Sequence, residues 1–486
     1  LVGSEMCIRD RVGTLHLDMI SLFPQNTFKG HKNGLRADLA QTLADLHPRF
    51  VRFPGGCVAH GDGIDNIYDW KGSIGPLEAR KPLRNLWGYH QTRGLGYFEY
   101  FRFCEDIGAE PLPVLAAGVP CQNSGTHSHY ADNCPQGANK ELMRYGQQGG
   151  IPMEEMPAYI QDVLDLIEYA NGDARRTVWG RKRAEAGHPK PFNLKYIGIG
   201  NEEVLFNGDR ADEYDHYVER FNLLHDAIKG KDPSVKLIST AWWRADSPSM
   251  ERTFRALDGK ADYWDYHPWA DQLASGREVE AELRRMRELF LRWNPSTTMK
   301  CAIFEENGNR HDMQRVLGHV TLQNAVRRMG DFVLTSCAAN ALQPYRQNDN
   351  GWDQGQVFFT PSQVWGMPPY YAQQMAAAHH RPLTVGCGVE GADGVLDVTA
   401  TRSREAGSVV LHIANTGAEP LRVGLRVDGM GKVSQARMVS LSGDLDAVNT
   451  PEEPRRIAPV GRELPAWAAQ TVDIAPYSYT IVVLDE

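Results

Sequence analysis

The sequence predicts a (β/α)8 barrel of parallel strands, followed by an antiparallel β-sandwich at the C-terminus. Short, continuously apolar segments alternate with amphipathic helical segments up to about residue 345, and this alternation is typical of a parallel sheet buried on both faces. Seven apolar segments favour a closed barrel over an open sheet. Beyond about residue 380, short alternating strands between turn residues are typical of a β-sandwich.

The first barrel unit begins after Pro24. Leucines at positions 35, 39, 43 and 46 lie on one helical stripe, and Pro48 ends that helix. The expected strand RFVRFPGG follows directly at residues 49–56.

The later units repeat this order of helix and strand. The expected helices cover residues 97–107, 156–170, 214–228, 279–293 and 317–334. The expected strands cover residues 110–118, 194–202, 235–243, 261–269, 298–307 and 339–345. Because a closed barrel of this class needs eight strands, one strand is unaccounted for, and we expect a gap or an edge in its place.

Three regions are expected along the chain. We interpret residues 1–20 as a non-native leader and a remnant strand of an upstream β-sandwich, because LVGSEMCIRDR fits no later pattern and GTLHLDMISL alternates apolar and polar residues. Residues 21–378 are expected to form the catalytic barrel, and residues 379–486 the C-terminal β-sandwich.

Composition and charge exclude several classes of partner. The 486 residues contain 52 Lys and Arg against 61 Asp and Glu, a net charge of −9, so nucleic acid and anionic membranes are not expected partners. No apolar run approaches the ~20 residues that span a bilayer. The eight cysteines show no zinc-site spacing, so we expect no metal. The cellular location stays open, with a preference for the periplasm or the extracellular space.

Polar residues end three of the expected strands. Arg52 lies within VRFPGG, residues 201–203 (Asn-Glu-Glu) end YIGIGNEE, and residues 305–307 (Glu-Glu-Asn) end CAIFEEN. Functional groups of a parallel barrel lie at the C-terminal ends of its strands. Glycoside hydrolysis needs two carboxyl groups on opposite walls of one mouth, one to protonate the leaving oxygen and one to attack or stabilise the sugar cation.

A single Glu at a strand end is most often a solvated loop residue. The combination of Asn-Glu on one strand, a second Glu three strands later and an Arg at an earlier strand end favours a catalytic pair. Trp87, Trp269 and Trp352 lie in loop-like positions after strands, where an indole face can stack on a sugar ring.

Several segments resemble the α-L-arabinofuranosidases of glycoside hydrolase family 51. They are SLFPQNTFKGHKNGLRADLAQTLADLHPRFVRFPGGC, WKGSIGPLEAR, GLGYFEYFRFCEDIGAEP, GHPKPFNLKYIGIGNEE and PSQVWGMPPYY. The resemblance implies a barrel enzyme without cofactor that acts on an arabinofuranosyl oligosaccharide or polysaccharide, and it implies self-association into a homo-oligomer. It also implies that the unaccounted strand is the family's first barrel strand, which would lie upstream of this chain.

The resemblance also assigns the catalytic roles. Glu202 matches the family's general acid/base. The family's pattern at the later strand selects Glu306 over Glu305 as the nucleophile. The residues implied to contact the sugar are Arg52, Cys57, Asn201 (at the 2-hydroxyl), His267, Trp269 and Gln356. Two residues depart from the family pattern: Asn307 replaces an aromatic residue, and Trp269 stands where Tyr is usual.

These observations favour a retaining enzyme that removes terminal α-L-arabinofuranosyl residues from hemicellulose or pectin oligosaccharides by double displacement. A β-xylosidase or endoglucanase of the same clan is an alternative, because paired carboxylates indicate the mechanism and not the sugar. A non-catalytic glycan-binding barrel fragment is a second alternative, which the missing strand favours and the presence of both carboxylates opposes.

Overall fold

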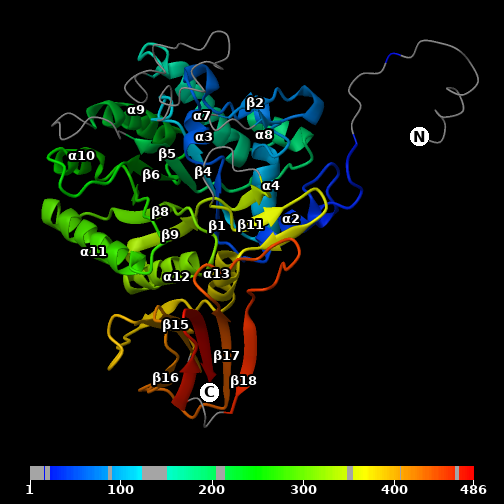
Figure 1. Ribbon diagram of the computed structural model, residues 1–486. Coiled ribbons are helices and arrows are strands. Elements are labelled where there is room, and N and C mark those ends of the chain that lie inside the picture. The colour runs from blue at the N-terminus through cyan, green and yellow to red at the C-terminus, as the bar shows by residue number, and fades with distance from the viewer. Residues whose placement is uncertain are drawn as a thin grey trace, which may run out of the picture.

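The computed structural model describes residues 16, 22–85, 90–122, 150–203, 214–346, 354–405, 407–465 and 470–486. A barrel-like unit carries the N-terminal and central parts of the chain, and a smaller β-rich unit carries the C-terminal part (Figure 1).

Seven parallel strands form the wall of the barrel, in the order in which they follow one another along the chain. They are β1 (Phe50–Phe53), β4 (Glu110–Leu115), β5 (Tyr196–Glu203), β6 (Lys236–Ala241), β7 (Tyr263–Asp265), β8 (Lys300–Glu306) and β9 (Val333–Ala338). Helices surround these strands: α2 (Ala37–Ala44), α4 (Tyr97–Ile107), α7 (Met156–Asn171), α8 (Val178–Glu185), α9 (Asp215–Lys231), α10 (Met250–Leu257), α11 (Ser275–Trp293) and α12 (Met313–Arg328). The short helix α3 (Cys57–His60) follows β1 and contributes Ala59 to the interior of the barrel.

Apolar side chains lie on both faces of this sheet. A compact inner cluster fills the barrel and contains Ala59, Leu112, Val114, Ile238, Ala302 and Phe304. A larger outer cluster packs the other strand faces against the helices, with Trp264 and Phe290 among its fully buried rings. Burial on both faces explains why the strands appear in the sequence as continuous apolar runs rather than alternating ones.

The expected position of the last barrel strand is wrong. Residues 339–345 do not enter the barrel, and β9 is the last strand of the barrel wall instead. Strand β10 (Leu342–Pro344), which lies within the expected segment, pairs with β11 (Val357–Phe359) in a small sheet that also contains β12 (Val364–Gly366). Helix α12 ends at Arg328, and Gly330 at φ +59° begins the turn into the strand. Because β9 is largely half-buried and mixes polar with apolar residues, its sequence lacks the continuous apolar run of the other strands.

The barrel wall is open between β1 and β9. These strands form the two edges of the seven-stranded sheet, and no ladder joins them among the described residues. A cavity of about 840 Å³ runs along this opening, from the mouth of the barrel to the apolar side chains of Leu43, Leu46 and Phe103. The remnant strand expected within residues 1–20 lies outside the described residues, apart from His16.

The C-terminal unit is a β-sandwich. Its larger sheet is antiparallel and contains, in spatial order, β13 (Leu383–Val385), β14 (Leu396–Arg402), β15 (Ser408–Asn415), β20 (Ser478–Asp485), β17 (Gln435–Ser442) and β18 (Val460–Leu464). The smaller sheet pairs β16 (Leu421–Gly424) with β19 (Thr471–Ile474), and an apolar cluster fills the space between the sheets. The boundary expected near residue 379 falls between α13 (Pro368–Ala378) and β13.

The sandwich packs on α12 and α13 through a shared apolar cluster. Arg328 adds polar contacts at this junction, donating to Glu280 Oε2 at 2.5 Å and to Asp397 Oδ2 at 3.0 Å. The junction therefore joins helices at the back of β8 and β9 to the C-terminal unit.

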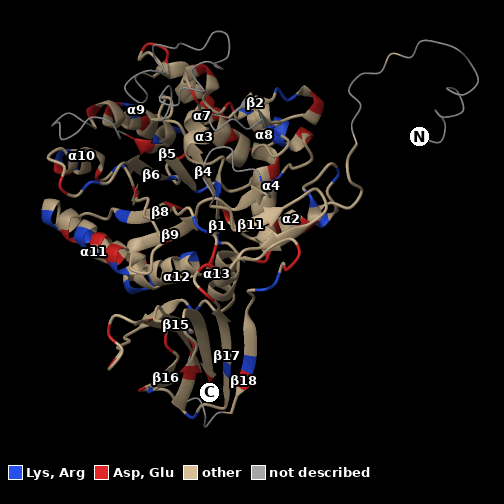
Figure 2. Ribbon diagram, in the orientation of Figure 1, with Lys and Arg blue, Asp and Glu red and all other residues tan. Residues whose placement is uncertain are grey.

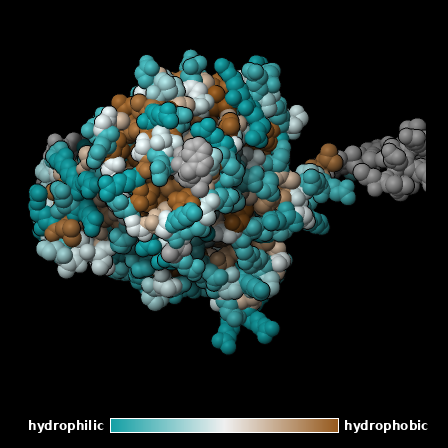
Figure 3. Space-filling model, turned by 90° about the horizontal axis from the view of Figure 1, so that it is seen from below, coloured by the Kyte–Doolittle hydropathy of each residue, from teal (hydrophilic) through white to brown (hydrophobic). Residues whose placement is uncertain are grey.

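The outer surface is charged and mixed. Figure 2 shows Lys and Arg interspersed with Asp and Glu along the outer helices, α11 in particular. The view from below in Figure 3 shows polar side chains over most of that face, with apolar side chains gathered near its centre. Within the described residues, no helix combines the length and apolar character needed to cross a bilayer.

Phe304 is central to the inner core and lies directly beneath the strand ends. Its side chain is 1% exposed, and a Cβ added to Gly198 would lie only 2.9 Å from its ring. We expect Phe304→Ala to lower the free energy of unfolding by about 3–5 kcal/mol, because it opens a cavity that close-packed neighbours cannot fill. Urea unfolding followed by circular dichroism measures this change. The control Leu291→Ala, at a side chain on α11 that is 45% exposed, should change it by less than about 0.5 kcal/mol; equal effects would contradict the assignment of Phe304 to the core.

Candidate active site

The C-terminal ends of four strands bring polar side chains together at the mouth of the barrel. Arg52 comes from β1, Asn201 and Glu202 from β5, His267 from the segment after β7, and Glu305 from β8. Because parallel strands end at the same side of a barrel, residues more than 250 positions apart in the chain meet there.

The end of β5 departs from regular strand geometry. Between Ile199 and Glu203 the strand advances four residues while its partner β6 advances two, which marks a bulge. Glu202 has φ +47°, a left-handed conformation that is uncommon outside glycine. The bulge lets Asn201 and Glu202 both reach the mouth, whereas Glu203 is buried and lies 3.2 Å from His60 Nε2.

A second bulge, in β8, decides which glutamate faces the cleft. Between Ile303 and Glu306 this strand advances three residues while β9 advances two. Regular alternation after the inward-facing Phe304 would turn Glu306 into the barrel. The extra residue reverses this alternation, so that Glu305 lines the cleft and Glu306 is directed away from it.

The structure therefore contradicts the expected placement of Glu306 opposite Glu202. The Glu306 side chain is fully buried, accepts a hydrogen bond from Ser336 Oγ at 3.0 Å, and contacts His319 Nδ1 on α12. Arg315 donates to its backbone carbonyl at 2.9 Å. Glu306 thus ties the end of β8 to α12 and β9.

Two cationic side chains hold Glu305. Arg52 Nη1 donates to Glu305 Oε2 at 3.0 Å, and His267 Nδ1 lies 3.8 Å from the same oxygen. Burial favours the neutral acid, but the charges of His267 and Arg52 outweigh it and hold the pKa of Glu305 below its ordinary value. Arg52 Nη2 also donates to Asn201 Oδ1 at 2.6 Å, which links β1 to β5 and β8.

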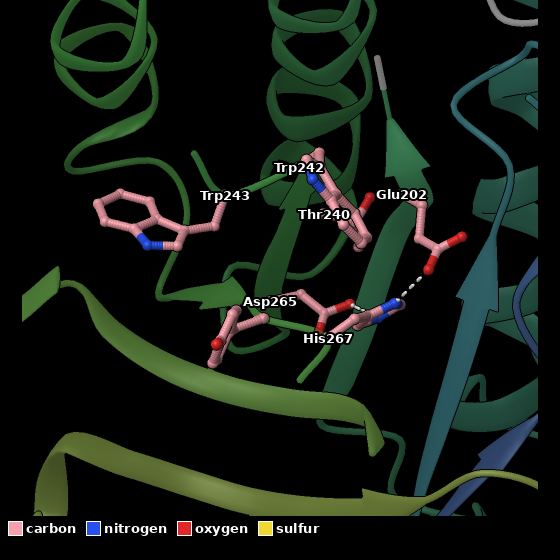
Figure 4. Close-up of a pocket in the computed structure, with 7 residues that line it drawn as sticks. Glu202, Thr240, Trp242, Trp243, Asp265 and His267 are labelled. Atoms are coloured by element: carbon pink, nitrogen blue, oxygen red, sulfur yellow. Dashed lines mark hydrogen bonds and ion pairs between the residues drawn. The ribbon is translucent and has the colours of Figure 1, made fainter. Parts of the chain in front are cut away.

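His267 lies between three carboxylates. Its Nδ1 is 2.9 Å from Glu202 Oε1 and its Nε2 is 2.8 Å from Asp265 Oδ2 (Figure 4). Burial opposes protonation, but Asp265 and Glu305 overcome it and raise the pKa of His267 to about 10. The ring is therefore an imidazolium at neutral pH, and both of its nitrogens donate.

Glu202, His267 and Glu305 each offer a polar atom within 4.8 Å of the other two. One oxygen of each glutamate is thus within 4.8 Å of one oxygen of the other, so the two carboxylates face each other across the mouth of the barrel. The same three atoms could hold a metal ion only if His267 lost its proton, which the neighbouring carboxylates oppose. We therefore interpret the group as an ion-paired cluster.

The large cavity opens onto this cluster. Of the residues predicted to bind the sugar, Arg52, Cys57, Trp269 and Gln356 line the cavity. Asn201 reaches the cluster through Arg52, and His267 lines a small hollow behind Glu202 together with Thr240, Trp242 and Asp265 (Figure 4). Trp269 is 46% exposed at the rim. Trp87 and Trp352 lie outside the described residues.

Two site residues escaped the sequence analysis. Asp265 stands two positions before His267, and this spacing on a strand could have revealed that both side chains share one face. Gln122 Nε2 donates to Glu202 Oε2 at 2.5 Å. Its position after β4 carries no pattern that distinguishes it from an ordinary loop residue.

The pKa of His267 predicts a pH dependence of stability. Since the folded state raises this pKa from an ordinary value of about 6.5 to about 10, the stabilisation from the protonated ring is complete below about pH 6.5 and is lost as the pH rises through 10. We expect the difference in free energy of unfolding between wild type and His267→Gln to be largest near pH 6 and to shrink toward pH 10 in urea titrations. A constant difference between wild type and His267→Gln across this pH range would contradict the ion-paired ring.

Two family models match the chain. The α-L-arabinofuranosidase 1 domain matches residues 42–285, and the α-L-arabinofuranosidase C-terminal domain matches residues 296–478. The two matches divide the chain between β7 and β8, within the barrel.

Two curated relatives are named as α-L-arabinofuranosidases. The extracellular exo-α-L-arabinofuranosidase of Streptomyces chartreusis is 41% identical over 237 residues, which are 46% of this chain and 25% of that protein. α-L-Arabinofuranosidase 1 of Arabidopsis thaliana is 28% identical over 480 residues, which are 96% of this chain and 63% of that protein. The chain thus spans about a quarter to two thirds of the length of these relatives.

Solved structures share the fold. An arabinose-bound family 51 α-L-arabinofuranosidase superposes with a TM-score of 0.75 at 23% identity, over 94% of this chain and 68% of that one. The α-L-arabinofuranosidase of Thermotoga maritima, in complex with arabinose, gives 0.70 at 20% identity, over 93% and 91% of the two chains. The two matching domain models show that the chain belongs to the α-L-arabinofuranosidase family, and the solved family 51 structures share its fold.

Proposed function

We propose that this chain acts as a retaining glycoside hydrolase that removes terminal α-L-arabinofuranosyl residues from oligosaccharides of hemicellulose or pectin. Glu305 is the nucleophile and Glu202 the general acid/base. The observation that carries the proposal is the approach of these two carboxylates to within 4.8 Å at the mouth of the barrel.

The surroundings of each glutamate support its role. Arg52 and His267 hold Glu305 in the ionised form that can attack the anomeric carbon. Glu202 lies beside the protonated His267, and its other oxygen accepts from Gln122. In the first step Glu202 gives its proton to the departing oxygen while Glu305 forms the glycosyl ester, and in the second step Glu202 takes a proton from the water that cleaves this ester.

The sugar specificity is inferred from the family. The relatives described above are named for α-L-arabinofuranosides, and Arg52, Asn201 and Gln356 offer hydrogen-bonding groups beside the carboxylate pair. Trp269 at the exposed rim provides an indole face for the part of the substrate beyond the scissile bond.

One structural feature favours a second candidate, a glycan-binding barrel without turnover. The opening between β1 and β9 extends the cavity beyond the size of a single sugar pocket and leaves Arg52 on an edge strand.

Activity assays with nitrophenyl glycosides distinguish the candidates. Turnover of the α-L-arabinofuranoside supports the proposal, preference for the β-D-xylopyranoside indicates a clan relative, and binding of arabinose without turnover of either indicates the glycan-binding barrel. Proton NMR of the first product gives its anomeric configuration, and inversion would contradict the mechanism.

The two neighbouring glutamates of β8 should differ sharply in substitution tests. We expect Glu305→Gln to lower kcat/KM on 4-nitrophenyl α-L-arabinofuranoside by about a thousandfold or more, equivalent to about 4 kcal/mol, because the variant lacks a nucleophile. Glu306→Gln should stay within about tenfold of wild type but lower the melting temperature, because it weakens the buried contacts with His319 and Ser336.

Added azide provides the control for these roles. Azide should restore turnover in Glu202→Ala with retained configuration, because it replaces the water that this residue activates. The reverse pattern, with severe loss in Glu306→Gln and near-normal activity in Glu305→Gln, would overturn the assignment of the nucleophile.

Gly56 allows the closest approach to the carboxylate pair. A Cβ at this position would lie 2.8 Å from Asn201 Oδ1 and 2.9 Å from Glu305 Oε2, and at these distances one of the neighbouring side chains must shift. We expect Gly56→Ala to reduce kcat/KM by more than about tenfold, because the added methyl group displaces the side chains of Glu305 and Asn201. Gly230→Ala on α9, where a Cβ meets no atom within 4 Å, is the matched control and should leave kcat/KM unchanged. Equal activity of the two variants would show that the Gly56 contact does not position the site.

A further inference from the structure

Three residues behind Glu202 form a hydrogen-bonded group. Gln122 Nε2 donates to Glu202 Oε2 at 2.5 Å, and Gln122 Oε1 lies 3.2 Å from Cys121 Sγ and 3.8 Å from Cys57 Sγ. Figure 4 shows one oxygen of Glu202 directed to His267 and the other directed away from it. The second oxygen is the one that meets Gln122.

The two thiols determine how the Gln122 amide is oriented. An amide has a donor end and an acceptor end, and a thiol S–H is a donor. Contact with Cys121, followed by burial, raises the pKa of Cys57 well above its usual range, so this thiol keeps its proton. With both thiols at its carbonyl oxygen, the amide presents its NH2 group to Glu202.

Burial makes this arrangement specific. Gln122 is 2% exposed, Cys121 fully buried and Cys57 6% exposed, so a reversed amide would place its oxygen against the Glu202 carboxylate, which only accepts, and its NH2 against sulfur atoms that accept weakly. Such a reversal leaves the buried amide oxygen and the carboxylate facing each other with no donor between them, which is unfavourable. Gln122 therefore has one favourable orientation.

We propose that Gln122, oriented by the thiols of Cys57 and Cys121, is a positioning residue for the acid/base Glu202. The inference rests on the proposed function, because it assumes that Glu202 transfers protons to and from substrate. With His267 on one oxygen and Gln122 on the other, the carboxyl plane of Glu202 is fixed toward the departing group.

Leaving-group dependence separates positioning from a general structural defect. Nitrophenolate departs with little acid assistance, whereas a sugar alkoxide needs the proton of Glu202. We expect Gln122→Met to lower kcat/KM on an arabino-oligosaccharide by about tenfold or more and on 4-nitrophenyl α-L-arabinofuranoside by less than about threefold. The high-pH limb of the oligosaccharide profile should move to higher pH, and it should move further in Gln122→Glu, because removing a donor or adding a like charge favours the protonated acid.

The thiol contacts are tested at Cys121. Cys121→Ala removes a donor to the amide and should reproduce part of the Gln122→Met effect, whereas Cys121→Ser keeps an O–H donor and should restore wild-type ratios between the two substrates. Cys104→Ala, which removes another buried thiol on α4, and Gln374→Met on α13 are the matched controls and should leave the substrate ratio unchanged.

The outcomes are distinguishable. Equal losses on both substrates without movement of the pH profile would assign Gln122 a structural role and overturn the inference. Unchanged kinetics in Gln122→Met would also overturn it, because Gln122 would then not position Glu202. If the wild-type chain turns over no arabinofuranoside, the proposed function itself fails. Turnover by the wild type, with losses in the Gln122 variants confined to the oligosaccharide, supports both.

Discussion

The positive charge on His267 allows two carboxylates to lie within 4.8 Å of each other at the barrel mouth. Two negatively charged carboxylates at this separation repel each other, and the cation between them offsets this repulsion. The imidazolium donates to Glu202 through one nitrogen and to Asp265 through the other, while Arg52 brings a second cation to Glu305. The same charges that permit the close pair also keep Glu305 ionised, so the electrostatics of the pair and the proposed role of Glu305 as nucleophile depend on one arrangement.

Backbone irregularities deliver the side chains to this cluster. The bulge in β5 turns both Asn201 and Glu202 toward the mouth, and the bulge in β8 does the same for Glu305. In regular strands adjacent residues point to opposite faces, so a pair of neighbouring functional residues on one strand requires such a departure. Glu203 and Glu306, displaced to the outside, are buried against histidines and attach the irregular strand ends to the surrounding helices. Each strand end thus carries one glutamate for the cleft and one for the framework.

These irregularities explain what the sequence could and could not predict. The alternation of apolar runs with helical stripes correctly predicted the parallel barrel, six of its seven described strands and the following sandwich. Polar residues at strand ends correctly located Arg52, Asn201 and Glu202 at the mouth. Glu306 was favoured over Glu305 because a pattern of residue positions carries no information about the bulge between them. Strand β9 was misplaced because its mixed composition follows from its position on an edge, and Gln122 was missed because its contacts cross from one strand end to another.

The opening between β1 and β9 raises the question of how Arg52, on an edge strand, keeps its place in the site. Main-chain pairing to β4 supports β1 on one side, and no described strand supports it on the other. The Arg52 side chain compensates at the mouth, where its two terminal nitrogens bind Glu305 of β8 and Asn201 of β5 across the barrel. Buried, charge-assisted hydrogen bonds of this kind are stronger than those between neutral groups. The mouth is thus held together by side chains that span the barrel, and the geometry of the carboxylate pair depends more on these crossing contacts than on closure of the wall.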